Sequence, residues 1–151
     1  MNKHASPSMK YAIAVVVSVV VTATIILYSP LRYTALIPPS MHDVDAKSIH
    51  AMIAADPNKY MFIDVRPASD YALAHAEGAS NTPIHLLYDQ VTTLPHSGKT
   101  IVLICSGGRL SGVAFFFLQH FGFTNVVRVA GGLDQWIAEG QPVVIPEAGA
   151  H

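Results

Sequence analysis

A short apolar run that leads directly into a glycine-rich loop constrains the fold of this chain more than any other feature. The run, residues 100–104, is Thr-Ile-Val-Leu-Ile, which is typical of a buried strand in a parallel sheet. The loop, residues 105–112, is Cys-Ser-Gly-Gly-Arg-Leu-Ser-Gly, and the apolar stretch 113–121 predicts a helix that ends at Gly122. A strand, a loop and a helix in this order predict one unit of an α/β fold.

The rest of the chain continues this alternation of strands and helices. Further strands are expected over 60–65 and 125–129, and further helices over 46–55, 68–74, 84–91 and 133–139. Asp45 is expected to cap the first of these helices. The pattern predicts an α/β architecture, a parallel sheet flanked by helices, in which ligands bind at the carboxyl ends of the strands.

Cys105 lies at such a strand end, and it is the only cysteine among the 151 residues. The N–H groups of a glycine-rich loop can converge on one point, and a helix N-terminus adds positive potential there, so the loop favours a thiolate. A buried cysteine that only packs is the alternative, but the crowding of glycines, Arg109 and Ser111 beside it favours a reactive thiol. A single cysteine also excludes a disulfide within the chain.

Charge and composition exclude one class of partner and direct attention to the N-terminus. The net charge is -1, with 9 Lys and Arg against 10 Asp and Glu, so nothing predicts nucleic-acid binding. Charged residues make up only 13% of the chain, against roughly 25% in a usual soluble protein. The run 11–28 carries no charge at all, and as a helix it would span ~27 Å, close to the thickness of a thin bilayer.

Residues 11–28 are therefore expected to form a transmembrane helix, an uncleaved signal anchor, with a cleaved signal peptide as the alternative. Lys3 and Lys10 precede the run and Arg32 stands alone after it. The positive-inside rule then predicts a single-pass protein of a bacterial-type cytoplasmic membrane, with its domain on the extracytoplasmic (periplasmic) side. The expected organisation is a tail 1–10, the anchor 11–28, a linker 29–40, a globular domain 41–144 and a tail 145–151.

Four stretches of the globular part resemble, in order, the rhodanese (sulfurtransferase) family. They are residues 62–71 with Asp-Val-Arg, 75–83, the loop 105–111, and 129–136 with Gly-Gly-Leu-Asp-Gln-Trp. The resemblance covers about two-thirds of the chain. It implies a single catalytic rhodanese domain, whose cysteine takes a sulfane sulfur as a persulfide and passes it to a thiophilic acceptor such as cyanide or a thiol.

Cys105 is thus the expected catalytic residue, and the rest of the loop is expected to bind substrate: Ser106, Gly107, Gly108, Arg109, Leu110 and Ser111. The N–H groups of the loop can hold the negative charge of a terminal sulfur. Ser111 can cap the following helix or donate a hydrogen bond to the sulfur. The sequence leaves open whether Arg109 faces an anionic donor such as thiosulfate or the solvent.

Asp64 and Arg66 are expected to support the site structurally, as a carboxylate–guanidinium pair beside the loop. No cofactor and no metal site are expected, because the eight histidines form no ligand-like cluster. The expected partners are a small sulfur-containing anion as donor and a thiol or cyanide as acceptor, with the protein partner unknown.

Two other functions compete with sulfur transfer. A dual-specificity phosphatase needs arginine as the sixth residue after its cysteine, and Ser111 stands there instead, which argues against phosphatase activity. A thiol or persulfide carrier, or a binding module, tethered to the membrane beside a partner enzyme would use the same loop without turnover. The sequence leaves this alternative open.

Overall fold

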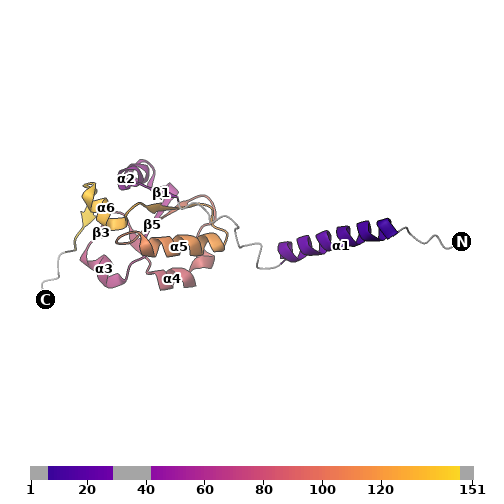
Figure 1. Ribbon diagram of the computed structural model, residues 1–151. Helices are drawn as coiled ribbons and strands as arrows, with labels where there is room; N and C mark the ends of the chain where they lie inside the picture. The colour runs from indigo at the N-terminus through magenta and orange to yellow at the C-terminus, as the bar shows by residue number, and fades with distance from the viewer. Residues whose placement is uncertain (1–6, 29–41, 147–151) are drawn as a thin grey trace. The chain divides into compact units, whose positions relative to one another are not determined.

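A computed structural model describes residues 7–28 and 42–146 (Figure 1). The chain divides into two compact units, Met1–Pro39 and Ser40–His151, and each is considered by itself. The predicted linker 29–40 lies outside the described residues, as do residues 1–6 and 147–151 of the predicted tails.

In the N-terminal unit the described residues form the helix α1 (Pro7–Tyr28). No helix of the described residues is long and apolar enough to cross a membrane. The predicted anchor over 11–28 is therefore wrong, and so is the predicted single-pass, periplasmic placement that depended on it.

The C-terminal unit is built on a five-stranded sheet in the order β1-β6-β5-β2-β4. Its strands are β1 (Asp43–Val44), β2 (Tyr60–Asp64), β4 (Ser80–Asn81), β5 (Thr100–Ile104) and β6 (Val126–Val129). Every pairing in this sheet is parallel, as predicted. The strand that leads to Cys105 is the central one, because β5 pairs with β2 on one side and with β6 on the other.

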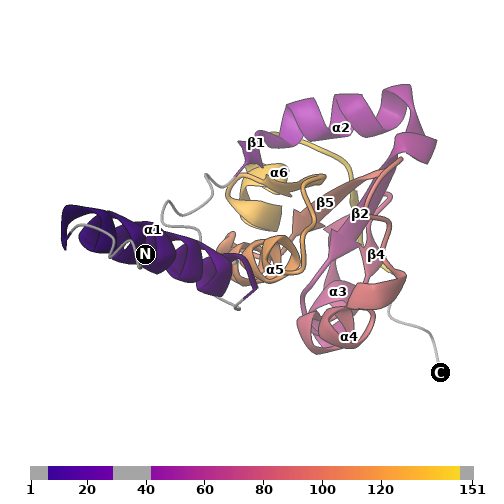
Figure 2. The same cartoon turned by 90° about the vertical axis from the view of Figure 1, so that its right-hand side faces the viewer.

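Helices cover both faces of this sheet (Figure 2). On one face, α4 (Ile84–Asp89) and α5 (Arg109–His120) pack against Ile101 and Leu103. On the other face, α2 (Ala46–Ala55) and α6 (Gly132–Ala138) pack against Val102 and Ile104. Alternate side chains of β5 thus enter two different cores, which explains why its sequence is an unbroken apolar run.

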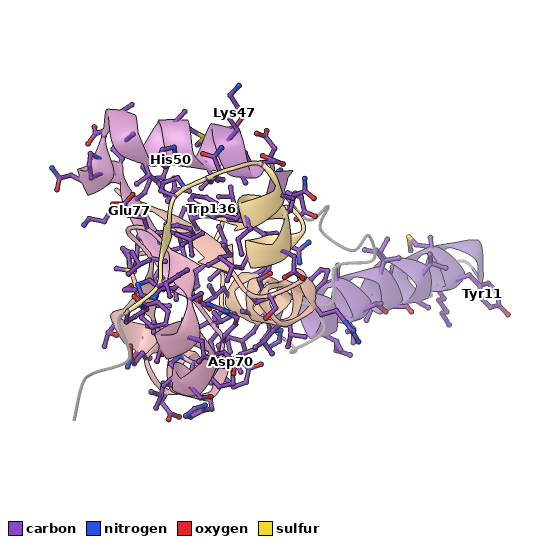
Figure 3. All side chains as sticks on the ribbon, turned by 90° about the vertical axis from the view of Figure 1, so that its left-hand side faces the viewer. Tyr11, Lys47, His50, Asp70, Glu77 and Trp136 are labelled. Atoms are coloured by element: carbon purple, nitrogen blue, oxygen red, sulfur yellow. The ribbon has the colours of Figure 1, made fainter. Side chains whose placement is uncertain are left out.

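The two helices on the second face are held together by Trp136 of α6, which is fully buried (Figure 3). Its ring meets that of His50 on α2 edge to face, with centroids 5.9 Å apart. Its Nε1–H donates to the carbonyl of Pro142 at 2.9 Å, which satisfies the one polar group of a buried indole. Trp136 thus links α6 to α2 and to the segment that follows α6.

The predicted helix over 46–55 is confirmed, together with its cap. Asp45 Oδ1 accepts a hydrogen bond from the backbone N–H of Ser48 at 2.8 Å. That bond favours the charged form, so the pKa of the Asp45 carboxyl lies below its ordinary value of 3.8.

One element differs from its prediction in a way that matters for function. The helix expected from residue 113 begins four residues earlier, at Arg109, because Gly108 turns the chain with a φ of 87° in the left-handed region. Half of the predicted loop is therefore the first turn of α5.

Short elements complete the unit. The helix α3 (Ala68–Leu73) confirms the helix predicted over 68–74. The elements that were not predicted are η2 (Pro57–Lys59), η3 (Val91–Thr93), and an antiparallel pair formed by β3 (His75–Ala76) and β7 (Val143–Val144). The pair β3–β7 ties the end of the domain to the segment that comes after α3.

Candidate active site

Cys105 is the first residue after β5 and is only 2% exposed. Its position at the carboxyl end of the central strand is the one predicted for a ligand site in a parallel sheet. Because β5 is paired on both sides, the point at which the loop begins is fixed by the sheet.

The sulfur of Cys105 receives two backbone hydrogen bonds. The N–H groups of Gly108 and Ser111 donate to Sγ at 3.2 Å and 3.3 Å. The thiol donates to Ser111 Oγ at 3.5 Å, and that hydroxyl donates to the carbonyl of Gly108 at 3.1 Å. Donors that converge on a sulfur stabilise negative charge on it, so the arrangement can support a sulfur nucleophile.

The position of Ser111 corrects one of its two expected roles. Ser111 lies inside the first turn of α5, and the residue that precedes the helix is Gly108, which provides no side-chain cap. The hydroxyl of Ser111 therefore does not cap the helix, and it lies instead within hydrogen-bonding distance of Sγ.

Four further N–H groups of the loop are left over for a ligand. Among the hydrogen bonds of the described residues, none uses the backbone N–H of Ser106, Gly107, Arg109 or Leu110. Those of Arg109 and Leu110 are free because the N–H groups in the first turn of a helix have no intrahelical acceptors. Unoccupied N–H groups of this kind can stabilise negative charge on a ligand.

Backbone N–H groups at the start of α6 orient the loop. The N–H groups of Leu133 and Asp134 donate to the carbonyls of Cys105 and Ser106, at 2.7 Å and 3.1 Å. In a planar trans peptide the N–H points opposite to the carbonyl, so these two bonds turn the N–H groups of Ser106 and Gly107 away from α6. A glycine is required for this approach, since a Cβ at residue 132 would lie 2.3 Å from both carbonyl oxygens.

Arg128 on β6 also holds the loop, and it was not predicted from the sequence. Its side chain is buried, and its Nε and Nη2 donate to the two carboxylate oxygens of Asp43 at 2.8 Å and 2.7 Å. Its Nη1 donates to the carbonyl of Gly108 at 2.8 Å. The signal that could have found it is a lone charge within the apolar strand Val-Val-Arg-Val.

The predicted pair of Asp64 and Arg66 forms at the end of β2. The guanidinium donates to the buried carboxylate through Nε at 3.0 Å and Nη2 at 2.6 Å, and Nη2 also donates to the carbonyl of Ala74 at 2.7 Å. Asn81 donates to the carbonyls of both residues. The pair thereby connects the end of β2 to the segments after α3.

The negative charge of Asp64 also affects the hydroxyl group of Tyr71. Burial, and after it the negative charge of Asp64, raise the pKa of Tyr71 above its ordinary value of 10.0. The neutral hydroxyl donates to the carbonyl of Ala79 at 2.6 Å. Tyr71 also stacks on the ring of His75, with centroids 3.8 Å apart, so both rings have structural partners.

A cavity of about 370 Å³ opens in front of Cys105. Its lining comes from the loop and from three flanking elements: Arg66, Pro67, Asp70, Cys105, Ser106, Gly107, Arg109, Leu110 and Asp134. Gly108 and Ser111 are absent from this lining and contact the sulfur instead. Asp70 on α3 (Figure 3) and Asp134 on α6 were not predicted, because only the fold brings them to the loop.

Arg109 lines this cavity with an exposed side chain. Among the described residues it has no ion pair and no side-chain hydrogen bond. Its guanidinium is therefore available to an anion in the cavity.

Comparison with known proteins assigns the fold and the loop to one family. A family described as the rhodanese-like domain matches residues 45–139. The chain is 26% identical over 107 residues to a sulfurtransferase of Allochromatium vinosum, an alignment that covers 71% of this chain and 98% of the relative.

A second relative is the thiosulfate sulfurtransferase PspE of Escherichia coli K12, 37% identical over 73 residues that cover 48% of this chain and 69% of PspE. The crystal structure of the Alr3790 protein from Anabaena superposes with a TM-score of 0.63 at 28% identity, covering 69% of this chain and 83% of that one. The matched region contains β2, the loop after β5 and the start of α6. The chain therefore belongs to the rhodanese-like domain family.

Proposed function

We propose that this chain is a sulfurtransferase in which Cys105 carries a sulfane sulfur as a persulfide between a donor and an acceptor. The observation that supports this most directly is the sulfur itself, which receives two backbone N–H groups and faces a cavity lined by further free N–H groups. A general role in sulfur transfer agrees with the names of the relatives.

In the first half-reaction the thiolate of Cys105 attacks the outer sulfur of the donor. With thiosulfate, the substrate in the name of PspE, a bond forms between Sγ and the outer sulfur. The bond from that sulfur to the sulfonate breaks, and sulfite leaves with the electron pair. Arg109, which is free of protein partners among the described residues, would attract the anionic donor.

In the second half-reaction the terminal sulfur leaves the persulfide. It would extend about 2 Å beyond Sγ. The cavity in front of Sγ is lined by Ser106, Gly107, Arg109 and Leu110, whose backbone N–H groups are unoccupied. These dipoles stabilise its negative charge without a covalent bond, so the sulfur stays transferable. Attack by cyanide or by a thiolate forms the new bond to this sulfur and returns the electron pair to Sγ.

The test uses the full chain with thiosulfate and cyanide. We expect the intact protein to gain the mass of one sulfur atom after thiosulfate, to lose it after cyanide, and to form thiocyanate over many turnovers. Cys105→Ser should lose both the adduct and the product while keeping the far-UV and near-UV circular dichroism of the wild type. Undiminished thiocyanate formation by that variant would overturn the proposal.

The number of turnovers decides between an enzyme and a carrier. A chain that accepts one sulfur and releases no thiocyanate beyond that single equivalent would be a carrier, and sulfurtransferase turnover would be excluded. An enzyme and a carrier can both belong to this family, so the turnover assay, and not the fold, distinguishes between them.

A further inference from the structure

The cavity in front of Cys105 carries charges of both signs. Arg66 and Arg109 supply two guanidinium groups, and Asp70 and Asp134 supply two carboxylates. No ion pair of the described residues joins a cavity arginine to a cavity aspartate. Charges of both signs therefore remain available to a ligand.

Arg66 presents an unused hydrogen-bond donor at this place. Its side chain is only 7% exposed, and its Nε and Nη2 are occupied by Asp64 and by the carbonyl of Ala74. No hydrogen bond of the described residues uses Nη1, and the residue lines the cavity. A guanidinium held in this way offers a fixed donor for a carboxylate.

Asp134 lines the same cavity and lies close to the loop. It is in the first turn of α6, and its Oδ2 is 3.4 Å from the position that a Cβ would take on Gly107. This carboxylate is exposed and has no ion-pair partner in the described part of the chain. Such a carboxylate attracts an ammonium group.

The balance of these charges selects among sulfur acceptors. Asp64 already compensates Arg66, so the lining of the cavity offers contacts to groups of both signs and not to anions alone. An acceptor with an ammonium and a carboxylate on one carbon satisfies both kinds of group at once. A cavity of about 370 Å³ has room for an amino acid beside the terminal sulfur.

We propose that the sulfur acceptor is a small amino-acid thiol of the cysteine class, with its carboxylate on Arg66 and Arg109 and its ammonium on Asp134 and Asp70. The inference rests on the proposed persulfide of Cys105. The acceptor thiolate attacks the terminal sulfur, the new S–S bond forms and the bond to Sγ breaks, and the electron pair returns to Sγ. The acceptor's thiol proton passes to solvent, and no external oxidant or reductant is needed.

The experiment isolates this second half-reaction. The full chain is loaded with thiosulfate, freed of excess donor, and checked by mass for one added sulfur. Transfer is then monitored to four thiols: cysteine, cysteamine with the ammonium alone, mercaptopropionate with the carboxylate alone, and mercaptoethanol with neither. Each thiol has its own reactivity, so the ratio of variant to wild type is compared for each, which cancels that difference.

Asp134→Asn should lower the second-order rate constant of transfer to cysteine and cysteamine about 5–10-fold, and change it less than twofold for mercaptopropionate and mercaptoethanol. Arg109→Gln should lower it for cysteine and mercaptopropionate by a similar factor. Asp89→Asn removes one charge from an exposed carboxylate outside the cavity lining and should change no ratio.

Equal losses for all four thiols, or no loss for any of them, would overturn the assignment of the acceptor. A wild-type chain that takes up no sulfur fails earlier, in the loading step, and overturns the proposed function together with this inference. The two failures are therefore distinguishable.

Discussion

Two backbone N–H groups and one hydroxyl contact the sulfur of Cys105. Their positions are set by the backbone of the loop, and hydrogen bonds to the carbonyl of Gly108 hold that backbone in place. The carbonyl of Gly108 accepts from Ser111 Oγ, from the N–H of Gly112 and from Arg128 Nη1. The first two donors belong to α5 itself. Arg128 is the donor that comes from the sheet, and it therefore fixes the loop relative to β6.

We expect Arg128→Lys to destabilise the domain by about 1.5–3 kcal/mol, because the single nitrogen of lysine cannot reproduce bonds that Arg128 makes from three separate nitrogens. It should also lower kcat of thiocyanate formation more than it changes KM for thiosulfate, because Arg128 positions the loop and is absent from the lining of the cavity in front of Cys105. Urea unfolding and steady-state kinetics measure the two effects.

Asp43→Asn is the matched control for Arg128→Lys, since it weakens the pair but leaves the bond from Arg128 to Gly108 in place. We expect it to reduce stability with a smaller effect on kcat. Equal effects of the two variants on kcat would show that Arg128 acts only through stability.

At the scale of elements, the start of α6 supports the loop through Gly132. This residue has a φ of 64°, and its missing Cβ would meet two backbone carbonyls. Gly132→Ala should therefore cost more than the roughly 1–3 kcal/mol of backbone strain alone, and it should displace Cys105 and abolish most of the activity. Thermal unfolding and the sulfur-loading assay measure both.

Gly140→Ala is the control for this contact, because Gly140 has a similar φ of 70° but nothing within 4 Å of its added Cβ. Gly140→Ala should lower the thermal stability through backbone strain, but it should load sulfur as well as the wild type. If the two variants load sulfur equally well, the contact between α6 and the loop has no role in the site.

The helix α2 provides a prediction about pH. The folded state lowers the pKa of Asp45 below 3.8, so this carboxylate contributes stability fully above the unfolded pKa and loses it as pH falls through the folded pKa. Asp45→Ala should therefore be less stable than wild type at pH 7, and the difference should shrink below pH ~3.8. Urea unfolding across that range measures it.

Asp45→Asn is the appropriate comparison, since an asparagine caps the helix without a titrating charge. Its stability relative to Asp45→Ala should stay constant through the acid range. A wild-type advantage that persists unchanged at low pH would contradict the assignment to the carboxylate.

At the scale of the whole molecule, features set by a local pattern are predictable from the sequence, whereas features set by distant contacts are not. The strand 100–104 is identified because both of its faces are buried, and Asp45 because a cap is a local interaction. The strands β3 and β7 have two residues each, which is too short for any periodicity. Arg128 and Asp134 reach the loop only through the sheet order and the docking of α6.

In the N-terminal run 11–28, a local pattern gave a wrong prediction. It predicted a transmembrane helix, and no helix of the described residues is long and apolar enough to cross a membrane. An uncharged stretch satisfies a composition rule for a membrane span, whereas a span also requires an apolar helix of sufficient length. The sheet, both cores and the cavity are formed by described residues within 43–144.

This separation predicts that the C-terminal unit folds and functions without the N-terminal one. A chain reduced to the unit Ser40–His151 keeps the complete sheet, both cores and every group around Cys105. We expect it to unfold in a single cooperative transition and to load sulfur from thiosulfate with kcat/KM within about twofold of the full chain. A large loss of loading with the circular dichroism unchanged would show that residues 1–39 contribute to the site, and a loss of cooperative unfolding would show that they contribute to the fold.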